Sequence, residues 1–245
     1  MEFKNSISFR VYGRMALFSD PITRVGGEKC SYMLPTYQAL KGICDSIYWK
    51  PTLMWVVDRV RIMNPIRTED RGQRVPKYSG GNDLSVYTYL VNVEYQVEAH
   101  FEWNEQRPEL EKDRNEHKHF LIAKRMLERG GRRDIFLGTR ECQAYVEPCV
   151  FGEGKGYYDN DSMSFGIMVH GISYPDETGL SKLQTRLWNA QMKNGIVDFI
   201  RPEECTMVMD TVNYSIKKFE KGKNFSGLDE FEKEGFFDGL DETAL

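Results

Sequence analysis

The sequence predicts an α+β protein: a ferredoxin-like (RRM-like) β-α-β-β-α-β domain followed by an appended antiparallel β-rich C-terminal part. Two observations support the ferredoxin-like class. Two segments with helical spacing of apolar residues occur in the first 150 residues, and four segments with alternating or β-branched residues surround them in the order strand, helix, strand, strand, helix, strand. A hydrophobic content of 40% with a charged content of 29% is that of an ordinary globular protein.

The first half of the domain reads as a strand, a helix and a second strand. Ser6 to Tyr12 alternates between apolar and polar residues, which predicts a half-buried strand. A loop over residues 15–33 follows. Pro35 begins a helix, because proline is tolerated in a first helical turn, and Pro51 ends it. Leu53 to Met63 is rich in Val, Trp and Ile and predicts the second strand.

The second half of the domain begins with residues 64–83, where two prolines and three glycines predict a long exposed loop. Leu84 to Glu102 alternates with period two and predicts a strand. A helix then starts at a polar cap, Asn115, and stops at Gly130-Gly131, since glycine readily takes the left-handed conformation that ends a helix. Ala144 to Val150 predicts the last strand.

We expect three parts: a ferredoxin-like domain at 1–150, a smaller β-rich domain at 151–222, and a flexible acidic tail at 223–245. In the second part, Ser164 to Ile172 and Cys205 to Val212 predict strands, and Lys182 to Met192 has a short helical pattern. Residues 226–245 hold seven acids and one lysine, so the remaining body carries a net charge of +2. The tail fits either a disordered acidic end or a docking segment for a partner subunit, and its composition favours the former.

Several classes of protein and site do not fit. No stretch approaches the roughly 20 apolar residues that span a bilayer, and MEFKNSISF is too polar for a signal peptide. We therefore expect a cytoplasmic protein with five reduced cysteines. No C-x-x-C pair is present, which argues against a zinc ribbon. Gly152 to Gly156 lacks the spacing of a phosphate loop, and the run beginning at Asp159 lacks the glycine and glutamate of a calcium loop.

Positive charge gathers on the second helix and the loop after it. From Lys112 to Arg140 there are nine basic and four acidic residues, in a chain whose total charge is -4. A patch of this kind suits a polyanion, with phosphate oxygens as the contact. A second basic cluster lies in the segment 64–83. The candidate contacts are Arg71, Arg74, Lys77, Arg132, Arg133 and Arg140.

Two residues in the first turn of the second helix are candidates for chemistry. His119 shares a helix face with apolar residues, and alone it would be best explained as a core histidine. Lys118 beside it opposes the helix dipole, and an anion bound there would remove that conflict. The same dipole favours the neutral imidazole that a general base requires. Tyr48, after the first helix, would alone be a packing aromatic, and the sequence does not show that it reaches His119.

The run KHFLIAKRMLERGGRRDIFLGTREC, the Tyr145–Pro148 step, the turn SIYWKPT and the segment SFRVYGRMALFSDPITRVGGEKCSY resemble one known family. This is the subtype I-C (Dvulg) CRISPR-associated protein family of the RAMP superfamily, which processes precursor CRISPR RNA. The similarity covers roughly residues 5–215. It implies an endoribonuclease that needs no metal or cofactor, cuts CRISPR repeat RNA and stays on the guide RNA as a subunit of the type I-C interference complex. The family's catalytic residues correspond to Tyr48, Lys118 and His119.

In the implied reaction the RNA 2′-hydroxyl attacks the adjacent phosphorus, giving a 2′,3′-cyclic phosphate and a 5′-hydroxyl. We assign proton transfer to His119, charge stabilisation to Lys118, and proton transfer or positioning to Tyr48. The expected partners are repeat and guide RNA and the other complex subunits, with target DNA as a further candidate and no membrane. Two alternatives stay open: a non-catalytic subunit that caps the 5′ handle of the guide, and a general nucleic-acid-binding protein or metal-dependent nuclease.

Overall fold

A computed structural model describes residues 5–213, 219–220 and 222–227. Within these residues, a mixed α+β fold is built around one large sheet of eleven strands, in which all pairings are antiparallel except that of β2 with β5. The α+β class predicted from the sequence is confirmed. Most of the predicted acidic tail, residues 228–245, lies outside the described part of the chain.

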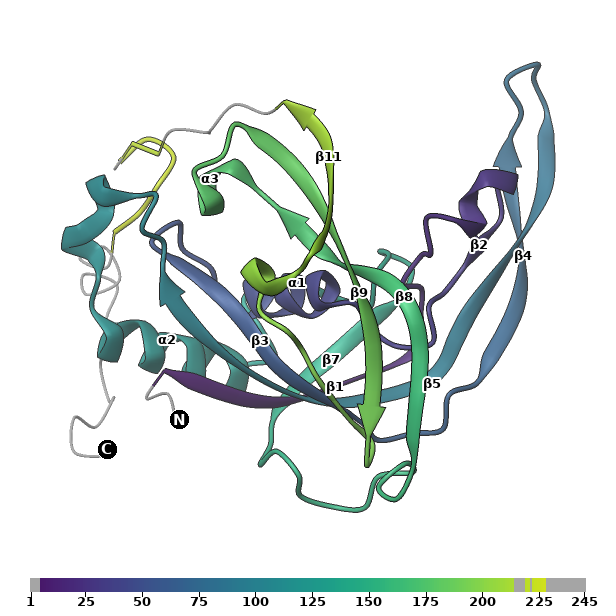
Figure 1. The fold of residues 1–245 in the computed structure, drawn as a ribbon, viewed down its shortest axis with the longest axis horizontal. Coiled ribbons are helices and arrows are strands. Elements are labelled where there is room, and N and C mark those ends of the chain that lie inside the picture. The colour runs from purple at the N-terminus through teal and green to yellow at the C-terminus, as the bar shows by residue number, and fades with distance from the viewer. Residues whose placement is uncertain (1–4, 214–218, 221, 228–245) are drawn as a thin grey trace.

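The elements follow one another along the chain as Figure 1 shows. The α-helices are α1 (Tyr37–Ile47), α2 (Glu116–Glu128) and the short α3 (Pro175–Thr178), and the 3-10 helices are η1 (Thr23–Gly26), η2 (Pro108–Asp113) and η3 (Pro202–Glu204). The strands are β1 (Ser6–Ala16), β2 (Lys29–Cys30), β3 (Leu53–Ile62), β4 (Thr68–Pro76), β5 (Asn82–Trp103), β6 (Ile135–Phe136), β7 (Gln143–Pro148), β8 (Ser162–Ser173), β9 (Lys182–Lys193), β10 (Ile196–Asp198) and β11 (Met207–Asn213).

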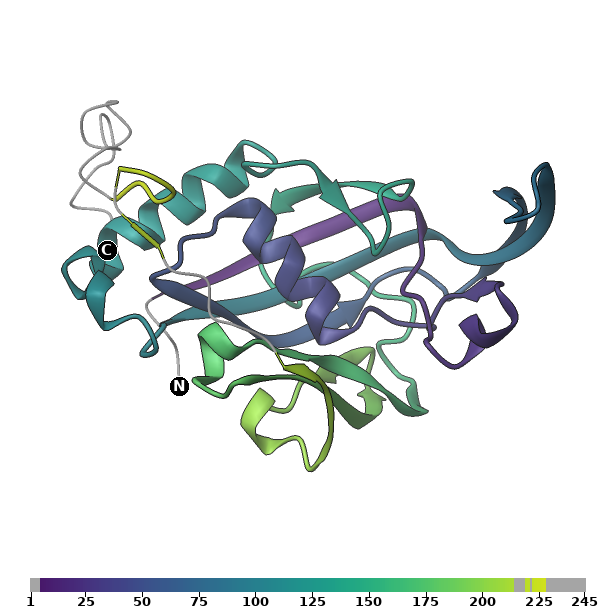
Figure 2. The same cartoon turned by 90° about the horizontal axis from the view of Figure 1, so that it is seen from above.

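The centre of the sheet has the order β3-β5-β1-β7, and each pair of neighbours is antiparallel. Both α1 and α2 lie over one face of these strands (Figure 2). Their starts are fixed locally, because the side chain of Thr36 accepts a hydrogen bond from the Ala39 amide and that of Asn115 accepts one from the Lys118 amide. Leu40 and Ile47 of α1 and Ile122 of α2 are buried in the core that results.

Residues 64–83 are not the loop predicted above. Nine of its residues, Thr68–Pro76, form β4, which pairs with β5 from Thr68–Leu90 to Pro76–Asn82. The turn of this hairpin uses Gly80 and Gly81, both with positive φ. Little of β4 is buried, so its sequence carries no apolar alternation, and only the pairing with β5 defines the strand. The hairpin projects from the body at the end away from α2 (Figure 1).

Residues 182–192 are not helical either, and they form most of β9. Their sequence fits both the helical period and the period of two that a strand has. In the structure the buried positions alternate, at Arg186, Trp188, Ala190 and Met192. Pairing with β8 on one side and with β11 and β10 on the other gives the backbone N–H and C=O groups of β9 their hydrogen-bond partners. The predicted strands at Ser164–Ile172 and Cys205–Val212 correspond to β8 and β11.

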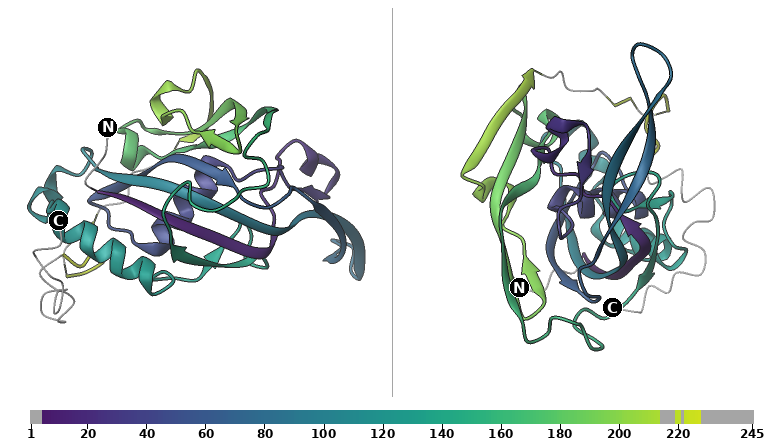
Figure 3. Two further views of the ribbon diagram at one scale, coloured as in Figure 1. Left: turned by 90° about the horizontal axis from the view of Figure 1, so that it is seen from below. Right: turned by 90° about the vertical axis from the view of Figure 1, so that its right-hand side faces the viewer.

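The C-terminal strands are joined to the central sheet through β10, which pairs with β3. With β8 and β9, β11 forms a layer beside α1 (Figure 3). The Tyr37 ring at the start of α1 stacks on His170 of β8, with centroids 4.4 Å apart. Packed against β3 and β8, α1 is fixed along its length, and this holds the residue that follows it, Tyr48. Among the described residues, no helix is long and apolar enough to cross a membrane.

Candidate functional site

The ends of the two helices meet at a pair of polar side chains in the core. Tyr48 is the residue that closes α1, and its amide donates to the carbonyl of Cys44. His119 lies in the first turn of α2. The Tyr48 hydroxyl and Nδ1 of His119 are 2.8 Å apart, and both side chains are 0% exposed. The convergence that the sequence left open is therefore present in the structure.

The second nitrogen of His119 defines its tautomer. Nε2 lies 2.8 Å from the backbone carbonyl of Asp113, which can only accept, so Nε2–H is the donor. Nδ1 is then the acceptor of the Tyr48 hydroxyl proton. Burial lowers the pKa of His119, opposed by its contacts with Asp113, and the positive charge of Lys50 lowers it further. The imidazole is thus held neutral, the form that can accept a proton.

Burial raises the pKa of Tyr48 well above its usual range, and the nearby carboxylate of Asp113 acts in the same direction. A phenol of this kind stays protonated and remains a hydrogen-bond donor to His119. Lys118 is the neighbour of His119 in the chain, but its residue is partly exposed rather than buried with the pair. Of the three predicted catalytic residues, the structure joins Tyr48 and His119 directly and leaves Lys118 at the surface of the same turn.

Asp113 and a group of aromatic rings hold this pair, and the sequence did not single them out. The Asp113 carboxylate accepts a hydrogen bond from Thr52 at 2.9 Å and lies 3.8 Å from Nε2 of His119. The indole N–H of Trp55 donates to the carbonyl of Tyr48, and the Trp103 ring meets His119 edge-on. Each of these contacts crosses between elements, so no local pattern could have revealed it.

Two of the predicted RNA contacts lie beside the pair. After Gly130 and Gly131, the amides of Arg132 and Arg133 both donate to the carbonyl of Ser46 in the last turn of α1. Both arginines are exposed, and with Lys50 they line a cavity of about 410 Å³ next to the turn that follows Tyr48. The glycine-rich end of α2 thus brings two arginines to the cavity beside the turn that follows Tyr48.

The remaining predicted contacts lie elsewhere. Arg71, Arg74 and Lys77 are on the β4 side of the projecting hairpin, far from α2 (Figure 1). Arg71 forms an ion pair with Glu69 and Lys77 with Asp83, at 2.8 Å and 3.4 Å. Arg140 is exposed in the loop between β6 and β7. The structure therefore divides the six basic residues into a group beside the turn that follows Tyr48 and groups away from it.

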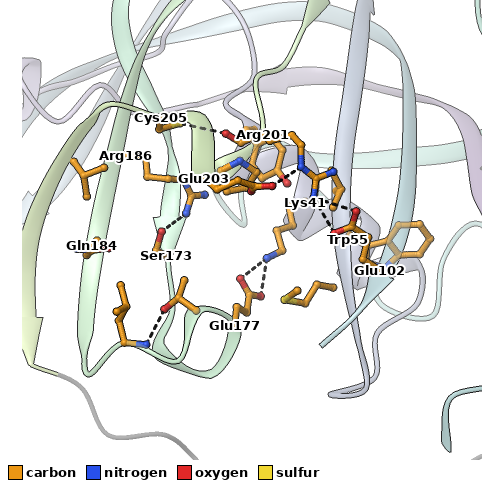
Figure 4. A pocket seen from close by; sticks show the side chains of 17 residues that line it. Lys41, Trp55, Glu102, Ser173, Glu177, Gln184, Arg186, Arg201, Glu203 and Cys205 are labelled. Carbon is orange, nitrogen blue, oxygen red and sulfur yellow. Dashed lines mark hydrogen bonds and ion pairs between the residues drawn. The ribbon is translucent and has the colours of Figure 1, made fainter. Parts of the chain in front are cut away.

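A second cavity, of about 430 Å³, lies between α1, the start of β9 and η3 (Figure 4). Its cations are matched by acids: Lys41 contacts Glu177 at 2.6 Å, and Arg201 contacts Glu102 at 2.9 Å. This balance makes it less suited to a polyanion than the cavity beside Tyr48. In the described part of the chain, no group of three or more His, Cys, Asp or Glu is arranged to hold a metal ion.

Comparisons of the chain with known proteins point to one family. The Cas5d family model, described as CRISPR-associated protein (Cas_Cas5), matches residues 6–200. The chain is 27% identical over 225 residues to the CRISPR pre-crRNA endoribonuclease Cas5d of Mannheimia succiniciproducens, covering 79% of this chain and 94% of that protein. A crystal structure of a CRISPR-associated protein matches with a TM-score of 0.72 and 37% identity, covering 83% of this chain and 96% of that chain. A functionally uncharacterized protein from Streptococcus mutans matches with a TM-score of 0.70 and 39% identity, over the same shares of the two chains.

Proposed function

The chain belongs to the Cas5d family of CRISPR-associated proteins, and on this premise we propose that it is an endoribonuclease that cuts precursor CRISPR RNA within the repeat. Its relative in Mannheimia succiniciproducens carries the name pre-crRNA endoribonuclease. The observation that carries the proposal is the hydrogen bond between the Tyr48 hydroxyl and a neutral His119. An imidazole held neutral beside a phenol is equipped for proton transfer.

The reaction uses the RNA's own nucleophile. A bond forms between the 2′-oxygen and phosphorus, the bond from phosphorus to the 5′-oxygen breaks, and the products end in a 2′,3′-cyclic phosphate and a 5′-hydroxyl. The proton of the 2′-hydroxyl passes to Nδ1 of His119, directly or through the Tyr48 hydroxyl that is bonded to it, and the departing 5′-oxygen takes up a proton from solvent water. Lys118, partly exposed in the same helical turn, stabilises the charge of the phosphorane.

RNA binding is divided between the two ends of the molecule. Arg132 and Arg133 hold phosphates next to the cleavage site, supported by their place in the cavity beside Tyr48. The exposed hairpin and the loop between β6 and β7 supply a second contact, through Arg71, Arg74, Lys77 and Arg140. After cleavage the protein stays on the guide RNA as a subunit of a type I-C interference complex in the cytoplasm, with target DNA as a further partner.

We also propose that residues 1–150 form a ferredoxin-like domain, followed by a smaller β-rich domain at 151–222. The strand order β3-β5-β1-β7 with two helices on one face supports the first. The grouping of β8, β9 and β11 beside α1 supports the second, although β10 continues the central sheet.

One assay tests the function. The full chain is incubated with repeat RNA in EDTA, and the ends of the products are mapped. We expect cuts at one site that leave a cyclic phosphate. Loss of cutting in EDTA would favour a metal-dependent nuclease, and binding without cutting would favour a subunit that only caps the 5′ handle.

A further inference from the structure

A C-terminal segment lies over the turn that follows Tyr48. This segment comprises Phe219, Glu220 and residues 222–227, and it closes the outer side of the 410 Å³ cavity whose inner side is formed by Trp49, Lys50, Pro51 and the two arginines after α2. The ammonium of Lys50 donates to the carbonyl of Ser226 at 2.5 Å and lies 5.5 Å from the centre of the Phe225 ring. The Phe219 ring lies 5.9 Å from that of Trp49.

Phe219 lies over a buried arginine, Arg107. Arg107 is 3% exposed, and its guanidinium carbon is 4.9 Å from the centre of the Phe219 ring. Within the described part of the chain, its Nε and Nη2 atoms have no hydrogen-bond partner, and its nearest acids, Glu109 and Asp176, are 3.7 Å away. A buried guanidinium left in this state is a costly arrangement unless a ligand completes it.

Arg107 and Lys50 are both linked to the proposed catalytic pair, Tyr48 and His119. Arg107 immediately precedes η2, whose last residue, Asp113, accepts the hydrogen bond from His119. Lys50 is close enough to His119 for its charge to lower the pKa of the imidazole. The segment therefore covers two cations, Arg107 beside the helix that ends at Asp113 and Lys50 beside Tyr48 in the chain.

The segment makes the same kinds of contact with Arg107 and Lys50 that an RNA strand would make. Phe219 and Phe225 present aromatic faces to Arg107 and Lys50, as stacked bases do, and the Ser226 carbonyl presents an oxygen to Lys50, as a phosphate does. Several of its hydrogen bonds are local, for example from the amides of Lys223 and Asn224 to the carbonyl of Glu220. Such a segment can leave the surface without breaking a sheet.

We propose that the C-terminal segment occupies the path of the RNA strand in the free protein, and that RNA displaces it and takes Arg107 and Lys50 as phosphate contacts beside the cleavage site. This inference rests on the proposed function. It adds a phosphate-binding arginine outside the predicted set, since Arg107 was not among the predicted RNA contacts.

Single-turnover cleavage in EDTA at increasing repeat RNA concentration tests the competition. Phe219→Ala with Phe225→Ala loosens the segment, and we expect the RNA concentration for half-maximal rate to fall about fivefold or more, because less of the protein is covered. The control is Glu220→Ala with Lys223→Ala, which removes an exposed ion pair of the same segment without changing net charge and leaves the cleavage curve unchanged. Equal or weaker binding by the phenylalanine variant would overturn the proposal.

Two further measurements do not depend on that variant. Arg107→Gln should weaken RNA binding and reduce the slope of log affinity against log salt by about one; a slope equal to that of the parent would remove Arg107 from the RNA path. In His119→Ala bound to uncut repeat RNA, the amides of residues 222–224 should exchange with solvent faster than in the free protein, and equal or slower exchange would show that the segment stays in place. If the parent neither binds nor cuts repeat RNA, the proposed function fails and this inference with it; if it does both while these results go the other way, only this inference fails.

Discussion

The hydroxyl of Tyr48 lies 2.8 Å from Nδ1 of His119, although 71 positions separate the two residues in the chain. The contact exists because α1 and α2 cover the same face of the sheet, so that the C-terminal end of one meets the N-terminal turn of the other. With Nε2 of His119 donating to Asp113, the hydrogen bond from Tyr48 fixes a neutral imidazole in a fully buried site. The following predictions start from this geometry.

Replacing His119 with alanine should slow cleavage roughly 10²-fold or more, the usual scale for losing a general acid or base, with RNA affinity little changed. Single-turnover rates and filter binding measure the two effects separately. His117→Ala is the matched control, since His117 is partly exposed in the same helical turn and is not bonded to Tyr48. Equal rates in His119→Ala and the parent would contradict the role of His119.

Tyr48→Phe keeps the packed ring and removes only the hydroxyl. We expect the cleavage rate to fall about tenfold or more, because Nδ1 loses its donor and the proton loses one route. The free energy of unfolding should change by only about 1 kcal/mol, the net value of one hydrogen bond. Urea unfolding and single-turnover rates test both statements. A variant that cuts at the parent's rate would reduce Tyr48 to a packing residue.

The cleavage rate should fall when the solution is made acidic. Because burial lowers the pKa of His119, the imidazole remains neutral below its usual pKa of about 6.5. If His119 accepts the proton, kcat/KM should stay level from pH 8 to about 6.5 and decline only on further acidification. A profile that instead declines as pH rises through this range would mean that His119 works as the acid and must be protonated first.

Arg133→Ala should weaken RNA binding and reduce its salt slope by about one, because one phosphate contact is lost. Lys193→Ala, at the end of β9, is the control for the loss of one positive charge, and it should leave the slope unchanged. Binding measured between low and moderate salt gives both slopes. An unaltered slope in Arg133→Ala would take this residue off the RNA surface.

His170 should make the fold sensitive to acid. It is 0% exposed, and burial together with the charge of Arg186 lowers its pKa to about 4. Since the unfolded chain binds a proton near pH 6.5 and the folded chain only near pH 4, the contribution of neutral His170 is complete above pH 6.5 and is lost as pH falls through that window. Between pH 7 and pH 5 this group alone should remove about 2 kcal/mol from the free energy of unfolding.

Urea unfolding of the parent and of His170→Gln at the two pH values isolates this term, because the buried His119 titrates in both proteins. The variant should lose less stability than the parent on acidification, whatever its stability at pH 7. Parallel losses would show that His170 is protonated in the folded protein.

The helices α1 and α2 and most strands could be predicted from the sequence, because the signals that define them act over a few residues. Asn115 caps α2 through the amide of Lys118, and Gly130 ends the helix by adopting positive φ. The two largest errors, β4 and β9, have one cause. β4 has no buried face to reveal it, and β9 fits two periods at once, so in each case only hydrogen bonds to a partner strand defined the element.

The sequence by itself also supplied the candidate residues of the site, since the family resemblance named Tyr48, Lys118 and His119. The tertiary structure alone decided how they relate. It joined Tyr48 to His119, placed the Asp113 carbonyl on Nε2 and left Lys118 partly exposed. Caps and alternation arise from neighbours in the chain, whereas a hydrogen bond between two helix ends depends on how both helices pack on one sheet, and that is set by the whole core.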